Sequence, residues 1–272
     1  MKQMNILKRT AATLAIIGTG TFLFNGLTET VMAARPGLVE TVPTSYQVSD
    51  SLAAPLPVAE TKQESNEEVN YYVSMDSLNK GTPTEMDLTM EEAAKVGEQY
   101  LKNIFGLDLK GAYVYMMYNA GTETFPRAFW SADVLFEKEQ TPESTRWNYM
   151  IDAVTGELFN ISHGRQLDAS PSLDYDAALE KNYGIYAELA KKKVEECRLL
   201  ASPIDRVEYG CQGYGGNDPD ISVEVIGENG EIVNMTFSRY DQTLLGIITD
   251  TSLRITESAL EDVSGEFEIF CF

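Results

Sequence analysis

The side chains best suited to catalysis or metal binding are scarce in this sequence. It contains one histidine, His163, and three cysteines, Cys197, Cys211 and Cys271, in 272 residues. A zinc site with several histidines and a pair of histidines acting as acid and base are therefore excluded. A cysteine nucleophile would need His163 as its base, but Cys197 and Cys211 fall on predicted apolar faces, where thiols are usually inert.

The three cysteines cannot all pair within one chain, so one internal disulfide is the most that can form. Cys197 and Cys211 are the candidate pair, because both are predicted to face the interface between a helix and a sheet. A bridge needs Cα atoms within about 7 Å, which is closer than most contacts between a helix and a sheet. The bridged and unbridged forms both stay open, and mass measurement with and without reductant separates them.

Short motifs that bind phosphate or expose a nucleophile are also absent from the sequence. No Gly-x-Ser-x-Gly elbow occurs, and no glycine loop carries the lysine of a phosphate site. Asn217, Asp218 and Asp220 offer oxygen atoms to calcium, but they lack the spacing of an EF-hand and suit a hairpin turn better. We predict that the chain is not an enzyme and has no metal or cofactor site. The residues that bind a partner are not predicted.

The first half of the chain begins with a predicted helix and continues as strands. Thr89 and Glu92 form a capping box, apolar residues then recur at helical spacing, and Gly106 ends the helix. Residues 112–118 and 128–136 alternate as strands. One helix therefore precedes a group of strands.

Residues 147–162 predict a β-hairpin. Apolar and more polar residues alternate before the turn, and a second apolar segment follows it. Asp152 can accept hydrogen bonds from amides of the turn, and Gly156 can adopt the positive φ that other residues resist. One short turn thereby fixes two strands in register.

The order of one helix and four strands carries a recognisable motif at each end. Glu92-Ala93-Ala94 opens the helix, and Tyr149-Met-Ile-Asp-Ala-Val-Thr-Gly-Glu-Leu158 closes the sheet. In these motifs, and over roughly residues 86–162, the chain resembles the PepSY domain family. PepSY domains occur in propeptides of thermolysin-like metalloproteases and in exported bacterial proteins. The resemblance implies a binding module that restrains or stabilises an exported peptidase or cell-wall hydrolase, and it carries over no site residue.

The second half repeats this order of elements. A Ser-Pro-Ser sequence at residues 170–172 predicts the start of a long helix, whose apolar stripe extends over residues 179–201. Four strands follow, and Asn229-Gly230 predicts a hairpin turn between two of them. We interpret the second half as a divergent internal repeat of the first.

Two alignments of the halves compete. Residues 226–234 look like residues 151–160, but this match would equate different connections between strands. Counting elements instead matches residues 153–156 with residues 240–243. We prefer the element count, because packing follows the order of elements. The second copy then lacks the Thr-Gly turn of the PepSY motif.

The N-terminus predicts export. Basic residues precede an apolar run over residues 11–27, and small residues allow cleavage between Ala33 and Ala34. Residues 1–33 are therefore a signal peptide, or an anchor if the apolar run stays uncleaved in the membrane. Residues 34–68 are rich in proline, serine, threonine and acidic residues and predict a flexible linker.

Charge and the C-terminal sequence limit the partners further. The formal net charge of −21 repels nucleic acid and anionic lipid, so contact with a membrane is expected only through residues 11–27. Residues 253–272 form an acidic tail, in which Phe267, Ile269 and Cys271 alternate as an edge strand that would need cover.

We predict an α+β protein with two modules, residues 69–164 and 165–252, each with one helix packed on a four-stranded antiparallel sheet. Residues 71–75 alternate briefly, which fits either a further strand or the end of the linker, and we prefer the end of the linker. Phe129 points away from the predicted core and would be exposed unless the second module or a partner covers it.

The predicted function is that of a secreted, non-catalytic binding protein that regulates an extracellular peptidase or cell-wall hydrolase. The alternative is a sensor or scaffold without a peptidase partner, held outside the cell by an uncleaved segment at residues 11–27. Sequencing the N-terminus of the mature protein separates the two, because a start at Ala34 favours the secreted regulator.

Overall fold

The computed structural model describes residues 70–263, apart from residues 80, 123–124, 139–140 and 142–143. The predicted signal peptide with its cleavage between Ala33 and Ala34, and the predicted linker, lie outside the described residues. So does the predicted C-terminal edge strand with Cys271.

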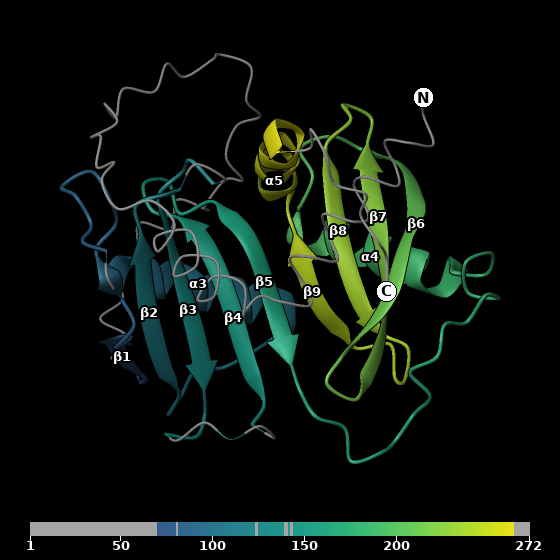
Figure 1. The fold of residues 1–272 in the computed structure, drawn as a ribbon, viewed down its shortest axis with the longest axis horizontal. Helices are drawn as coiled ribbons and strands as arrows, with labels where there is room; N and C mark the ends of the chain where they lie inside the picture. The colour runs from purple at the N-terminus through teal and green to yellow at the C-terminus, as the bar shows by residue number, and fades with distance from the viewer. Residues whose placement is uncertain (1–69, 80, 123–124, 139–140, 142–143, 264–272) are drawn as a thin grey trace.

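The described residues form one mixed sheet of nine strands with helices on both faces (Figure 1). The strands lie in the order β1-β2-β3-β4-β5-β9-β8-β7-β6, and every neighbouring pair is antiparallel except β1 and β2. In chain order the elements are β1 (Tyr72–Met75), α3 (Met90–Phe105), β2 (Tyr113–Asn119), β3 (Phe129–Leu135), β4 (Arg146–Asp152), β5 (Leu158–Gly164), α4 (Gly184–Cys197), β6 (Ile204–Gly215), β7 (Asp218–Gly227), β8 (Ile232–Ser238), β9 (Leu244–Ile248) and α5 (Asp250–Val263).

The α+β class is confirmed, but the expectation of two separate four-stranded sheets is wrong. β5 and β9, the last strands of the two halves, pair antiparallel, with Asn160 opposite Ile248 and Ser162 opposite Gly246. A lone edge strand leaves its outer amides and carbonyls unpaired, and this pairing satisfies them for both halves at once. The two halves therefore share one sheet.

The helices divide between the two faces of the sheet. α3 packs on β1 to β4 and α4 packs on β6 to β8, and the two helices touch each other on the same face. α5 packs on β5 and β8 from the opposite face, and Figure 1 shows it in front of the strands with α4 behind them. We call the face that carries α5 the open face.

The predicted caps of α3 are confirmed. The Thr89 hydroxyl accepts from the backbone N–H of Glu92, and the Glu92 carboxylate accepts from the backbone N–H of Thr89. Gly106 ends the helix at φ 69°. At its centre, the helix lies so close to the sheet that a Cβ atom added to Gly97 would be 2.0 Å from the Tyr149 ring.

The second helix is shorter than predicted. α4 begins at Gly184 rather than near residue 172, and no side chain caps its start. Residues 174–183 contain turns instead, among them one that Asp176 stabilises by accepting from the backbone N–H of Ala178. The helix ends at Arg198, which has a φ of 52°, so the predicted stripe at residues 179–201 extends beyond the helix at both ends.

Two segments expected to be irregular are regular. The segment interpreted as the end of the linker contains β1, which pairs in parallel with β2. The first part of the predicted acidic tail belongs to α5. Its Ile255 packs against Phe129, Phe125 and Phe159, so this helix covers Phe129 on the open face. Phe129 is 3% exposed.

The two halves share register as well as element order. β5 and β9 meet with Ile161 opposite Ile247, 86 positions apart in the chain. The pairing of β4 with β5 shifts by one residue after Met150, and the pairing of β8 with β9 shifts in the same way after Thr236, again 86 positions later.

The turns after β4 and β8 also have one geometry. In residues 152–157 and in residues 238–243, the first residue donates its N–H to the last carbonyl at 2.8 Å. The fifth residue donates to the first carbonyl and has a positive φ, 71° for Gly156 and 65° for Gln242. The expected match of the halves is therefore shifted by one residue, since Gly156 corresponds to Gln242 rather than to Thr243.

We predict that Gly97→Ala destabilises the protein by about 3 kcal/mol, because the new methyl group overlaps the Tyr149 ring and forces α3 away from the sheet. Urea unfolding followed by circular dichroism measures this change. Gly184→Ala is the matched control, since no atom lies within 4 Å of its added Cβ, and it should shift stability by less than about 1 kcal/mol. Equal effects of the two substitutions would contradict the packing.

Candidate functional site

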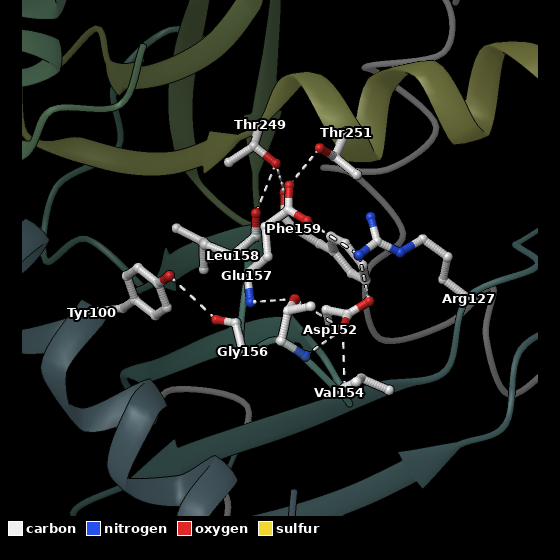
Figure 2. Close-up of polar contacts among 11 residues, drawn as sticks. Tyr100, Arg127, Asp152, Val154, Gly156, Glu157, Leu158, Phe159, Thr249 and Thr251 are labelled. Atoms are coloured by element: carbon white, nitrogen blue, oxygen red, sulfur yellow. Dashed lines mark hydrogen bonds and ion pairs between the residues drawn. The ribbon is translucent and has the colours of Figure 1, made fainter. Parts of the chain in front are cut away.

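The turn between β4 and β5, within the predicted motif, is closed by several side-chain and backbone hydrogen bonds. The buried Asp152 carboxylate accepts from the backbone N–H groups of Val154 and Thr155 at 2.9 and 2.7 Å, and from the Thr155 hydroxyl. Tyr100 of α3 donates its hydroxyl to the carbonyl of Gly156 at 3.2 Å (Figure 2). The sequence predicted the roles of Asp152 and Gly156 in this turn, and both are confirmed.

Arg127, in the loop before β3, joins the turn to its surroundings. Its guanidinium lies 2.6 Å from the Asp152 carboxylate and 3.2 Å from that of Glu157. It also lies 5.0 Å from the centre of the Phe159 ring, within the range of a cation–π contact. One guanidinium therefore pairs with two carboxylates at this turn.

The beginning of α5 is bound to the same turn. The Thr251 hydroxyl donates to Glu157 at 2.5 Å, and the Thr249 hydroxyl donates to the carbonyl of Leu158 at 2.8 Å (Figure 2). We call Arg127, Asp152, Glu157 and Thr251 the clasp. Because the acidic groups of the clasp are paired and partly buried, the arrangement holds α5 on the open face rather than offering a carboxylate to a substrate.

The sheet edge formed by β1 is the second candidate site. Tyr72, Met75 and Leu78 are exposed there, and β1 has β2 as its one neighbour among the described strands. A hollow of about 240 Å³ lies between β1 and the first turns of α3, lined by Tyr71, Val73, Glu91, Glu92 and Lys95. An unpaired edge beside a hollow suits the binding of an extended peptide.

The predicted chemistry-bearing residues lie apart. The His163 ring stacks on Trp147 at 4.8 Å and meets the edge of Phe105 at 6.0 Å, and burial lowers the pKa of His163. Cys197 lies 3.6 Å from the carbonyl of Asn103, whereas Cys211 lies beside the Ser222 hydroxyl. His163 thus packs in an aromatic cluster, and the structure has no bridge between Cys197 and Cys211.

The residues weighed as calcium ligands form a hairpin connection. The Asn217 amide donates to the carbonyls of Leu167 and Ala169, and Asp218 pairs with Arg165 at 2.8 Å. Over the described residues, no group of three or more histidine, cysteine, aspartate or glutamate side chains is arranged to hold a metal ion. In that same part of the chain, no helix is long and apolar enough to cross a membrane.

Comparison with known proteins gives one structural match to report. The chain is similar to the Bacillus megaterium YpeB C-terminal domain at 14% sequence identity, with a TM-score of 0.40. The match covers 61% of this chain and 65% of the other, so the chain spans less than two thirds of that domain. No family model and no curated protein matches the sequence.

We predict that Asp152→Ala destabilises the protein by about 3 kcal/mol, because it leaves the turn amides unpaired and removes a buried partner of Arg127. Urea unfolding measures the change. The control is Asp205→Ala, whose carboxylate forms an exposed pair with Arg206, and which should cost less than about 1 kcal/mol. Equal losses in the two variants would show that the clasp does not stabilise the fold.

Asp220 should make the stability depend on pH. Burial raises the pKa of Asp220 from 3.8 to about 6. Since the folded state binds this proton more tightly than the unfolded chain, the stabilisation is complete below pH 3.8 and is lost as the pH rises to about 6. Asp220→Asn should remove this loss, which is on the order of 1–3 kcal/mol.

Urea unfolding of wild type and Asp220→Asn at pH 4, 5, 6 and 7.5 tests the assignment. The exposed Glu195→Gln is the control and should follow the wild-type profile. If Asp220→Asn also follows the wild-type profile, Asp220 is not the group that titrates.

Proposed function

We propose that the chain arose by duplication of one PepSY-like unit of a helix and four strands. Three observations support this: the strand shift after Met150 and after Thr236, the shared turn geometry, and the pairing of the halves around Ile161 and Ile247. The helices agree as well. The buried positions of α3 at Ala93, Ala94, Gly97 and Leu101 have the spacing of Tyr186, Ala187, Ala190 and Val194 in α4.

We further propose that the protein is an exported, non-catalytic binding protein that restrains or stabilises an extracellular peptidase or cell-wall hydrolase. The observation that carries this proposal is the β1 edge, with exposed apolar side chains and the adjacent hollow. Peptide segments bind such edges by adding a strand, with main-chain hydrogen bonds for affinity and side-chain pockets for specificity. The identity of the enzyme class rests on the PepSY resemblance of residues 86–162.

The backbone geometry of β1 defines how a partner strand would pair. Tyr72 donates its N–H to the carbonyl of Ala112, and Asp76 donates to that of Met116, so alternate residues face β2. Val73 and Met75 between them therefore direct their N–H and C=O groups toward the outer edge. The hollow beside this edge is lined by two carboxylates, Glu91 and Glu92, against one cation, Lys95, which favours a partner segment with basic side chains.

We predict that Met75→Pro abolishes capture of the partner, because proline removes one outward N–H and blocks strand addition without breaking a β1–β2 hydrogen bond. The full chain is used as bait for proteins of the culture supernatant and the cell-wall fraction. Met75→Ala removes the same side chain and should still capture the partner.

Recovery of a peptidase or hydrolase by wild type and Met75→Ala, but not by Met75→Pro, is the expected result. Recovery of neither enzyme class by wild type would contradict the proposed function. Equal recovery by all three proteins would contradict binding at the β1 edge.

A further inference from the structure

A row of polar residues crosses the open face from strand to strand. The register places one residue of each of eight neighbouring strands in this row. The row consists of Ser74, Tyr115, Asp133, Asn148, Ser162, Gly246, Thr236 and Ser222. We call it the polar row. Every member except Gly246 has a side chain that is able to form hydrogen bonds, whereas the opposite sheet face packs an apolar core under α3 and α4.

The first part of the polar row is accessible. Ser74 is exposed, and Tyr115, Asp133, Asn148 and Ser162 are half-buried. At a strand spacing of about 4.8 Å, these five positions extend over roughly 19 Å. The Asn148 amide donates to the Asp133 carboxylate, which fixes the orientation of both side chains. A ligand across these strands would meet a preformed set of donors and acceptors.

Beyond Gly246, the row contains a polar group that lacks a partner. Thr236 is 1% exposed, and its hydroxyl has no hydrogen-bond partner in the described part of the chain. The side-chain oxygen and nitrogen of Asn234, on the same strand face two residues away, have none either. Both side chains are 1% exposed and closed to a ligand on the surface, so the accessible part of the row alone can bind one.

An aromatic platform lies at the accessible end of the row. The rings of Tyr72 and Tyr113 are stacked with centroids 5.1 Å apart, and their register puts them on the same face as Tyr115. Tyr72 is 64% exposed. Tyrosine rings offer a flat apolar surface with a polar tip, which suits the apolar face of a sugar ring.

The chemistry of the row selects among polymers. The carboxylate of Asp133 on this face and the net charge of −21 repel anionic polymers such as nucleic acid. An apolar helix would bury the polar row without hydrogen bonds. An extended peptide pairs through its backbone, and the backbone groups in the middle of a sheet are already paired.

We propose that the polar row and the Tyr72–Tyr113 platform bind an extended neutral oligosaccharide laid across the strands. Hydroxyl and amide groups of the glycan take up the donors and acceptors of Asp133, Asn148 and Ser162, and one sugar packs on the tyrosines. The advance per sugar in a β-linked pyranose chain is similar to the spacing of strands. This surface shares Tyr72 with the β1 edge but extends over the open face, and the inference does not depend on a peptidase or hydrolase partner.

Nuclear magnetic resonance titration of the full chain tests the proposal. The probes are β-1,4-linked hexamers of N-acetylglucosamine, glucose and mannose, and decalysine is the cationic peptide arm. We expect at least one hexamer at millimolar concentration to shift the signals of the Asn148 side-chain amide and of its neighbours in the row. No shift with any hexamer, or shifts in the row with decalysine alone, would overturn the proposal.

A pair of substitutions localises the binding. Asn148→Leu removes the amide at the centre of the accessible row and should weaken glycan affinity at least tenfold. Asn103→Leu makes the same change at an exposed position of α3 and should leave affinity unchanged. Equal affinities of the two variants would overturn the proposal, and the shift map of the wild-type chain decides the matter if Asn148→Leu does not fold.

Discussion

The pairing of β5 with β9 is the contact on which the rest of the structure depends. Either half alone would end in an unpaired strand with an apolar face, which is a site for aggregation. Joining the two last strands removes both edges and places Ile161 and Ile247, each about 1% exposed or less, at the centre of one core. Among the described strands, the sheet then ends at β1 and β6, far from the junction (Figure 1).

Local features of the fold could be predicted from the sequence, because their causes lie within a few residues. The capping box of Thr89 and Glu92, the left-handed Gly106 and the hairpin turn at Asp152 are of this kind. The start of α4 could not be predicted, since its apolar stripe continues into residues 174–183, where turns replace the helix. Joining of the halves into one sheet depends on strands more than eighty residues apart, and alternation alone does not specify a partner.

The candidate sites divide in the same way. Asp152 and Gly156 are visible in the sequence because turn chemistry is local. Arg127 and Thr251 carry no comparable signal, because their shared partner is distant in the sequence. Glu157 lies 30 positions from Arg127 and 94 positions from Thr251. The polar row has no periodic signature either. Each of eight strands contributes one member, and only the register brings the members into line.

The contacts across the junction explain why the second turn differs from the first. Thr251 follows β9 and donates to Glu157 in the turn of the first half, while Arg165 follows β5 and bonds to Thr243 in the turn of the second half. The two donors, Arg165 and Thr251, are 86 positions apart, and so are the two acceptors, Glu157 and Thr243. The two contacts are therefore equivalent.

The source of the cation, however, differs between the two turns. In the first half, Arg127 of the same half neutralises Asp152. In the second half, Ser238 stands where the first half has Asp152. Asp218 stands where the first half has Arg127, since each lies two residues before the strand partner of Ser238 or Asp152. Arg165 from the first half supplies the cation to Asp218 and Asp241. Hydrogen bonding to Arg165 lowers the pKa of Asp241. Because ion pairs with Arg165 hold it, the second turn has the geometry of the first although Gln242, not glycine, has the positive φ. The absence of a Thr-Gly motif from the second half is therefore compatible with the same backbone, because the stabilising ion pair there comes from the other half.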